Sequence, residues 1–235
     1  MALLHEKAMR GHTNMGWLDS FHTFSFGGFS DPHRMGHRGL RVINEDRVIG
    51  GAGFGTHEHA NMDILTFVVS GSLRHEDSIG NGSVIVPGEI QMMSAGSGIR
   101  HSEMNASATD PVHFLQIWII PEAQNVAPRY AQLAYSNETT NSRFGLIAGP
   151  DSEVETLSAV PLHSGARVYL ANLSDGDTVA HTFATGRHGF LQIIGGMVEI
   201  EGEKLSAGDG LQFSGQEVCT VKALSDGQVM LFDLG

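Results

Sequence analysis

Residues 64–77 read ILTFVVSGSLRHED. β-branched and aromatic residues fill the first half, and Gly71-Ser72 separates it from a second half in which apolar and polar residues alternate. Short runs of this composition, bounded by glycine, are typical of β-strands. The stretch therefore predicts two strands joined by a hairpin turn at Gly71.

The same pattern extends along the chain in both directions. Asn81-Gly82 and Pro87-Gly88 separate further short apolar runs, and Asn-Gly is a strong hairpin signal. The runs are LRVIN, SVIV, EIQMMS and HFLQIWII before residue 121, and RVYLANL, FLQIIGG, MVEIEG, GLQF, VCTVKAL and QVMLFDL after residue 150. Residues 121–150 lose the alternation and predict a connection with a short helix. The pattern predicts an all-β protein.

Two histidine-rich stretches interrupt these runs. Residues 53–63 read GFGTHEHANMD, and residues 98–105 read GIRHSEMN. Because side chains alternate along a strand, the two histidines of the first stretch share one face, as do the histidine and the first glutamate of the second. A lone strand histidine is more often a surface or hydrogen-bonded residue, but three imidazoles and one carboxylate suit a divalent transition metal. The candidate ligands are His57, His59, His101 and Glu103.

The two halves of the chain resemble copies of each other. Aligning the glycine turns of FVVSGSLRH and LQIIGGMVE places His57 opposite His181 and His59 opposite Phe183. The alternative is that any two antiparallel sheets share glycine turns and alternating Val, Ile and Leu. We favour duplication and expect two antiparallel β-barrels. The first, residues 1–130, would hold the metal, and the second, residues 131–235, would hold none.

Composition narrows the classes of partner. Of 235 residues, 41% are hydrophobic and 17% are charged, as in a globular protein. The net charge of −12 disfavours direct nucleic-acid binding and allows a protein partner. The single cysteine, Cys219, excludes an intramolecular disulfide. No apolar run approaches the roughly 18 residues of a membrane span, and MALLHEKAMRGH lacks a signal-peptide core, so we expect a cytoplasmic protein.

Several longer motifs resemble one known family. GWLDSFHTFSFGGFSDP, LRVINEDRV, GAGFGTHEH and MSAGSGIRHSEMN are similar, in this order, to segments of the pirin family of the cupin superfamily. The resemblance covers essentially the whole chain. It implies a bicupin, two β-barrels of the jelly-roll type packed face to face, with one metal in the N-terminal barrel. That metal is usually iron, and Mn, Co, Ni, Cu or Zn also suit the donors. The family's four ligands correspond to His57, His59, His101 and Glu103.

The chain departs from the general cupin pattern at two positions. Asp63 stands where many cupins have a glutamate ligand, and Gly96 stands where a proline often precedes the third ligand. The resemblance to pirins assigns the carboxylate ligand to Glu103, so Asp63 is expected beside the ligands without binding the metal. His22, Phe24 and Phe26 are expected to pack an N-terminal strand, with pocket lining as the alternative for them. His75 is expected to have no special role.

Two classes of function follow from the resemblance. Pirin-like bacterial proteins resemble quercetinases, which open the central ring of a flavonol with dioxygen and release carbon monoxide. In this reading Glu103 is also catalytic, because a carboxylate can accept the proton of the substrate hydroxyl. The alternative is a metal-containing regulatory module that binds a protein partner without turnover. Turnover of a flavonol would discriminate between the two classes.

Overall fold

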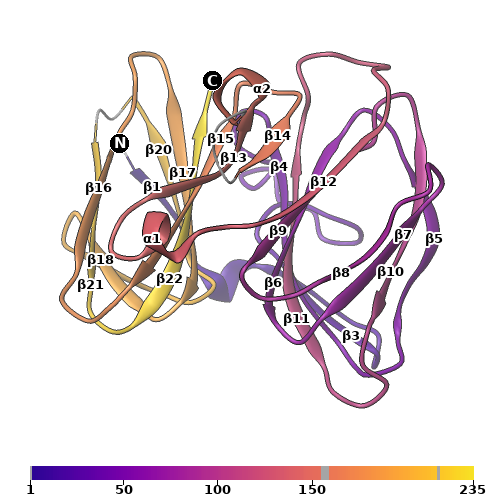
Figure 1. Ribbon diagram of the computed structural model, residues 1–235. Coiled ribbons are helices and arrows are strands. Elements are labelled where there is room, and N and C mark those ends of the chain that lie inside the picture. The colour runs from indigo at the N-terminus through magenta and orange to yellow at the C-terminus, as the bar shows by residue number, and fades with distance from the viewer. Residues whose placement is uncertain (1, 155–158, 216–217) are drawn as a thin grey trace. The chain divides into compact units, whose positions relative to one another are not determined.

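The computed structural model describes residues 2–154, 159–215 and 218–235, and these fold into two compact units (Figure 1). The N-terminal unit contains residues 11–134 and 160–164, and the C-terminal unit contains the other described residues. Strands dominate both units, which confirms the all-β class. Among the described residues, no helix has the length and hydropathy to cross a bilayer.

The N-terminal unit consists of two antiparallel sheets. Its strands are β2 (Gly11–Asn14), β3 (Leu18–His22), β4 (Leu40–Val48), β5 (Gly53–His59), β6 (Asp63–Ser70), β7 (Leu73–Asp77), β8 (Gly82–Ile85), β9 (Glu89–Ser94), β10 (Ile99–Asn105), β11 (Val112–Ile119), β12 (Arg129–Ala134) and β14 (Val160–Leu162). The larger sheet has the order β12-β9-β6-β11-β4-β3-β2, and the smaller sheet has the order β5-β10-β7-β8. Strands of both sheets contribute residues to an apolar cluster that includes Leu73, Ile85, Val112 and Phe114.

The C-terminal unit repeats this arrangement. Its elements are β1 (Ala2–His5), the 3-10 helix η1 (Lys7–Met9), α1 (Asn137–Thr140), β13 (Gly145–Pro150), α2 (Asp151–Val154), β15 (Arg167–Leu173), β16 (Thr178–Thr182), β17 (His188–Gly195), β18 (Met197–Ile200), β19 (Glu203–Ser206), β20 (Gly210–Ser214), β21 (Val218–Ala223) and β22 (Gly227–Leu234). Within this unit one sheet contains the order β1-β20-β17-β22-β15-β13, and the other sheet has the order β16-β21-β18-β19. The order β16-β21-β18-β19 matches β5-β10-β7-β8 strand for strand, which supports duplication.

The chain passes between the units at more than one point. The sequence places the boundary at residue 130, whereas the main crossing in the structure follows residue 134. In addition, β1 pairs with β20 and so joins the C-terminal unit, while residues 160–164 join the N-terminal unit. In Figure 1 the indigo β1 lies among the yellow and orange strands. Local sequence carries no signal for which distant sheet a short edge strand will join.

The turn at Gly71 is a corner and not the predicted hairpin. β6 pairs with β9 and β11 in the larger sheet, whereas β7 pairs with β8 and β10 in the smaller sheet. Gly71 has a φ of 78°, and a Cβ there would lie 2.7 Å from the carbonyl oxygen of Pro111. Glycine therefore allows the chain to leave one sheet and enter the other. The hairpin predicted around Asn81-Gly82 is confirmed by the pairing of β7 with β8.

The predicted connection over residues 121–150 has more structure than expected. Its short helix, α1, is confirmed, and the Ser136 side chain accepts a hydrogen bond from the backbone N–H of Glu138 as its N-terminal cap. The segment also contains β12 and β13, which the sequence does not predict. β12 has a half-buried and exposed pattern without alternation, because it is an edge strand that pairs only with β9 in the larger sheet.

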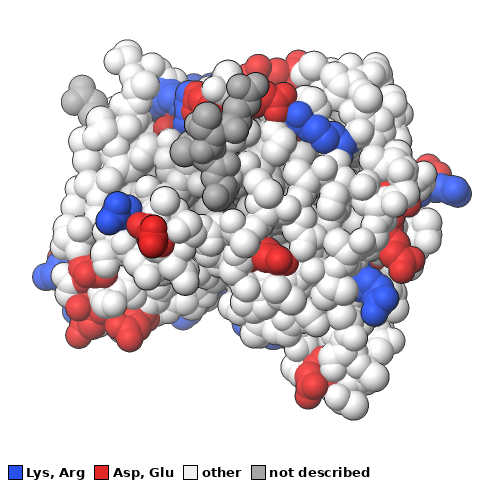
Figure 2. All heavy atoms as spheres, in the orientation of Figure 1, with Lys and Arg blue, Asp and Glu red and all other residues white. Residues whose placement is uncertain are grey.

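Lysine and arginine side chains are dispersed on the face that Figure 2 draws. Figure 2 shows Lys and Arg side chains singly or beside Asp and Glu on the face that it draws. The expectation of no direct nucleic-acid contact stays a prediction.

Candidate metal centre

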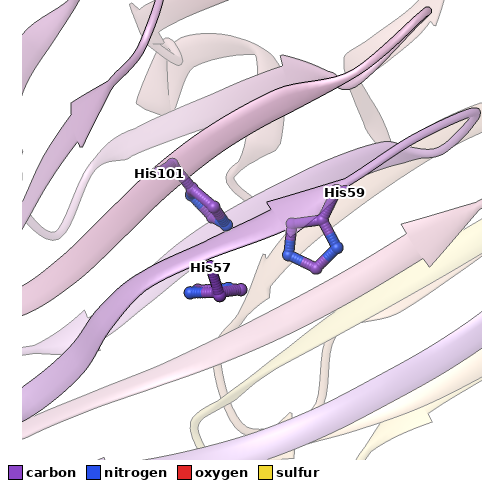
Figure 3. A group of neighbouring side chains, drawn as sticks. All are labelled: His57, His59 and His101. Atoms are coloured by element: carbon purple, nitrogen blue, oxygen red, sulfur yellow. The ribbon is translucent and has the colours of Figure 1, made fainter.

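Three histidines meet on the smaller sheet of the N-terminal unit. β5 and β10 are antiparallel neighbours, and His57 is the register partner of His101. Each of the three histidines offers a ring nitrogen, and these atoms all lie within 4.8 Å of one another (Figure 3). Glu58, between the two histidines of β5, is exposed, as strand alternation predicts. The sequence prediction that these three imidazoles converge is therefore confirmed.

The hydrogen bonds of the histidines leave nitrogens available for a metal. The Nδ1 atom of His57 lies 2.8 Å from the carbonyl oxygen of Gly55, so it carries the proton and Nε2 is the free donor. His101 is 2% exposed, and neither of its ring nitrogens has a hydrogen-bond partner among the described residues. Buried polar atoms are rarely left without partners. The group thus fits a divalent metal ion, which would supply the missing partner.

Burial keeps two of the imidazoles neutral. It lowers the pKa of His59 to about 4, and the neighbouring His57 lowers it in the same direction. Burial lowers the pKa of His101 to about 3, and His57, His59 and His75 add to this effect. Neutral imidazole is the form that binds metals, so neither ring must lose a proton at neutral pH before it can coordinate.

Glu103 lies on the same strand as His101, and its carboxylate is hydrogen-bonded by two side chains of the larger sheet. Gln116 Nε2 donates to Glu103 Oε2 at 2.6 Å, and Thr66 Oγ1 donates to Oε1 at 3.4 Å. Glu103 is 1% exposed, and burial raises its pKa to about 7. The nitrogens that lie within 4.8 Å of one another belong to histidines, so a ligand role for Glu103 stays a prediction.

An irregularity in the pairing of β5 with β10 lies beside this carboxylate. The register shifts between His101 and Glu103, so that Glu103 pairs with Phe54. Gly53 is required at this point, because a Cβ there would lie 2.4 Å from the carbonyl oxygen of Glu103. A β-bulge of this kind redirects side chains locally, and bulges are frequent next to active sites.

A largely apolar cavity is lined in part by two of the three histidines. It has a volume of about 370 Å³, and its aromatic lining consists of Trp17, Phe26, Phe54 and Trp118. The polar lining consists of His57, His59, Glu103 and Gln116. Ring contacts order this wall: His59 lies edge to face with Trp118 at a centroid distance of 4.9 Å, and Phe26 lies 5.5 Å from Trp118. Such a cavity accommodates a planar aromatic molecule within reach of the donors.

The structure corrects the expectation for two residues, Asp63 and Phe26. Asp63 does not face the histidines: it begins β6 in the opposite sheet, is fully buried, and its Oδ2 accepts a 2.7 Å hydrogen bond from the backbone N–H of His163. It thereby fixes residues 160–164 to the N-terminal unit. Phe26 lines the cavity, which was the alternative reading for it, while Phe24 is buried at 1% exposure.

Two residues near the histidines, His75 and Gln116, are not predicted as functional from the sequence. His75 is fully buried, its ring centroid lies 5.3 Å from that of His101, and its Nε2 lies 3.2 Å from Asp77 Oδ2. Gln116 contacts Glu103. Two features of the sequence could have indicated them. In LRHED the histidine shares the strand face of the apolar leucine, and in HFLQIWII the glutamine is a polar residue within an apolar strand. His75 therefore belongs to the surroundings of the metal centre, contrary to the expectation that it has no special role.

The equivalent positions of the C-terminal unit carry different side chains. In the register of β16 and β21, His181 pairs with Cys219, as His57 pairs with His101. His181 Nε2 lies 3.0 Å from Asp233 Oδ2, and Phe183 and Cys219 belong to the apolar core. Burial raises the pKa of the Cys219 thiol to about 12, so the thiol is protonated at neutral pH.

One metal equivalent per chain is therefore expected, and replacing His181 with alanine should leave that content unchanged. A lone imidazole that is already hydrogen-bonded cannot hold a transition metal tightly. Elemental analysis of tag-free wild-type and His181→Ala protein checks this. Two tightly bound equivalents in the wild type, or a large loss of metal in the variant, would contradict the assignment of one site to the N-terminal unit.

Comparisons with known proteins agree with this description. Residues 4–119 match the family model described as Pirin, and residues 146–234 match the model described as Quercetinase C-terminal cupin domain. A protein named quercetin 2,3-dioxygenase from Escherichia coli K12 is 42% identical over 100% of this chain and 99% of its own length. A pirin-like protein from Caulobacter vibrioides is 36% identical over 95% of each chain.

Solved structures extend the agreement to three dimensions. The crystal structure of YhhW from Escherichia coli superposes with a TM-score of 0.94 at 42% identity, covering 100% of this chain and 98% of that one. A second crystal structure, of the bacterial pirin YhhW in complex with nickel(II), gives a TM-score of 0.93 at 42% identity, covering 100% and 99%. With two family models and full-length relatives in agreement, the chain belongs to the pirin family and has its two-domain cupin fold.

Proposed function

We propose that this protein is a metal-dependent dioxygenase of the quercetin 2,3-dioxygenase type. The observation that carries the proposal is the group of His57, His59 and His101, two of which, His57 and His59, line an aromatic-walled cavity of about 370 Å³. The full-length relative named quercetin 2,3-dioxygenase supports the substrate class. A flavonol and dioxygen are the proposed substrates, and a depside and carbon monoxide are the products.

One divalent transition metal is the proposed cofactor, with Fe(II) as the first choice. His57, His59 and His101 would hold it, and Glu103 is proposed as the fourth ligand. Mixed nitrogen and oxygen donors also accept Mn, Co, Ni, Cu or Zn, and a related bacterial pirin has been crystallised with nickel(II). When bound, such a metal supplies a Lewis acid for an ionised hydroxyl and open coordination positions for chemistry with dioxygen.

The chain's own residues contribute positioning and proton transfer. Trp17, Phe54 and Trp118 form the apolar wall that holds the planar rings of a flavonol and excludes water. Glu103 is the proposed acceptor of the proton from the substrate's 3-hydroxyl. Burial raises its pKa to about 7 and so favours acceptance of a proton by the carboxylate.

The proposal is tested by oxygen uptake. Protein reconstituted separately with each of the six metals is supplied with quercetin, and the consumption of quercetin and oxygen is measured together with carbon monoxide release. We expect equal molar amounts of all three with at least one metal, and none with metal-free protein. If no reconstituted form shows flavonol-dependent oxygen uptake, the quercetinase assignment is wrong and the regulatory, protein-binding reading is favoured.

A further inference from the structure

A row of buried polar side chains crosses the larger sheet of the N-terminal unit. His22, Asn44, Gln116, Thr66 and Gln91 are successive register partners on β3, β4, β11, β6 and β9. Each of them is 9% exposed or less. Buried polar side chains are costly unless they are hydrogen-bonded, so a row of five in one sheet calls for specific partners. For two members of the row, Gln116 and Thr66, that partner is Glu103 from the opposite sheet.

The side-chain amide of Gln116 uses both of its ends. Its Nε2 donates to Glu103 Oε2 at 2.6 Å, and its Oε1 accepts from the indole Nε1–H of Trp118 at 3.2 Å. Rotating the amide by half a turn would place a carbonyl oxygen against the carboxylate and an NH₂ group against the indole N–H. Both contacts would then be repulsive. The indole therefore fixes the orientation in which the amide donates to Glu103.

This pair of bonds connects the cavity wall with the carboxylate. Trp118 lines the cavity and lies edge to face with His59 at 4.9 Å. The bond from Gln116 to Glu103 is short, and a hydrogen bond to an ionised carboxylate is roughly twice as strong as one between neutral groups. Partners of this kind around metal ligands orient the ligands and tune the metal.

We propose that Gln116 is a positioning residue, which sets the orientation of the Glu103 carboxylate through a hydrogen bond whose direction is fixed by Trp118. Gln116 acts through Glu103 and does not itself touch the metal. The proposal rests on the proposed function in one respect, namely that Glu103 is a metal ligand and the proton acceptor. It adds that the wall that receives the aromatic rings and the group that receives the proton form one hydrogen-bonded unit.

The test replaces Gln116 with methionine, which has a similar size and no hydrogen-bonding amide. The histidines remain, so the variant should still bind one equivalent of Co(II). We expect its Co(II) affinity to fall by about 10- to 100-fold, the usual range for losing a partner of a metal ligand. The visible absorption of the Co(II) protein should change in position or intensity. With quercetin, kcat should fall by a similar factor, while KM changes little.

Gln91→Met is the matched control. It removes the same amide from the same row at a position that is 1% exposed, on a strand that is not adjacent to β11. Its Co(II) spectrum and affinity should equal those of the wild type. Trp118→Phe is a second variant, which removes the indole N–H and keeps an aromatic ring. It should shift the Co(II) spectrum in the same direction as Gln116→Met and serves as the test if that variant does not fold.

The outcomes separate this inference from the proposed function. A wild-type Co(II) spectrum and affinity in both Gln116→Met and Trp118→Phe would overturn the positioning role, even if the wild-type protein consumes quercetin. An altered spectrum in both variants, with Gln91→Met unchanged, would support the role even if no metal form of the protein shows oxygen uptake. Equal changes in all three variants would mean a general loss of buried polarity and would also overturn it.

Discussion

Replacing His101 with alanine is expected to remove nearly all bound metal and to leave the fold intact. His101 is the central member of the group: its ring centroid lies 4.4 Å from that of His57 and 4.9 Å from that of His59. Two imidazoles on a single strand, with at most one carboxylate, hold a divalent transition metal far more weakly than three imidazoles do. The expected occupancy after gel filtration is close to zero, against one equivalent in the wild type.

The fold should survive because the core does not depend on this side chain. The apolar cluster between the sheets is formed by residues such as Leu73, Ile85 and Phe114, each fully buried. Neither ring nitrogen of His101 is hydrogen-bonded to a described residue, so none of these residues loses a bond when the imidazole is removed. The increase in thermal stability that the metal brings to the wild type should be absent in the variant, since a ligand stabilises only the state that binds it.

Elemental analysis and circular dichroism together check this expectation. His33→Ala is the matched control, because His33 is an exposed histidine of the same unit and should keep the full metal content. A full equivalent in His101→Ala would place the metal elsewhere. Unfolding of the metal-free variant at room temperature would instead show that the site is structural.

The sequence predicts which side chains of β5 and β10 share a face, because side chains alternate along a strand. In GTHEH and IRHSE the alternation of a strand decides which side chains share a face, and the structure has Glu58 and Arg100 exposed on the other side. Local sequence did not identify the turn at Gly71 correctly. A glycine with positive φ suits a hairpin and a corner equally well, and only the distant pairing of β7 with β10 and β8 decides between them.

Contacts across the two sheets could not be predicted from the sequence. Gln116 is recognisable as a polar residue in an apolar strand, but its partner Glu103 comes from the opposite sheet. His75 likewise has an inward parity, yet its proximity to His101 depends on the register of β7 with β10. Hydrophobic periodicity gives the direction of a side chain from its own strand. It gives no information on which residues of the opposite sheet the side chain meets. Those residues determine the hydrogen bonds of a polar network.

The second large effect is expected from Glu103→Gln, which should lower kcat for quercetin by about 100-fold or more while most of the metal is retained. Glutamine has nearly the same shape, and its amide oxygen can still accept the hydrogen bond from Gln116 Nε2. The three histidines are unchanged. The amide cannot accept a proton from the 3-hydroxyl of the flavonol, so the loss should fall on the chemical step and not on the binding of quercetin.

Two measurements at equal metal occupancy separate these roles. Steady-state oxygen uptake gives kcat and KM. The absorption band of quercetin bound without oxygen reports whether its 3-hydroxyl is ionised, and we expect the ionised form in the wild type and the neutral form in Glu103→Gln. Glu58→Gln makes the same chemical change at an exposed position of β5 and should behave as the wild type. If Glu103→Gln binds ionised quercetin and turns over at the wild-type rate, another group accepts the proton. If it loses its metal as His101→Ala does, the carboxylate serves chiefly as a ligand.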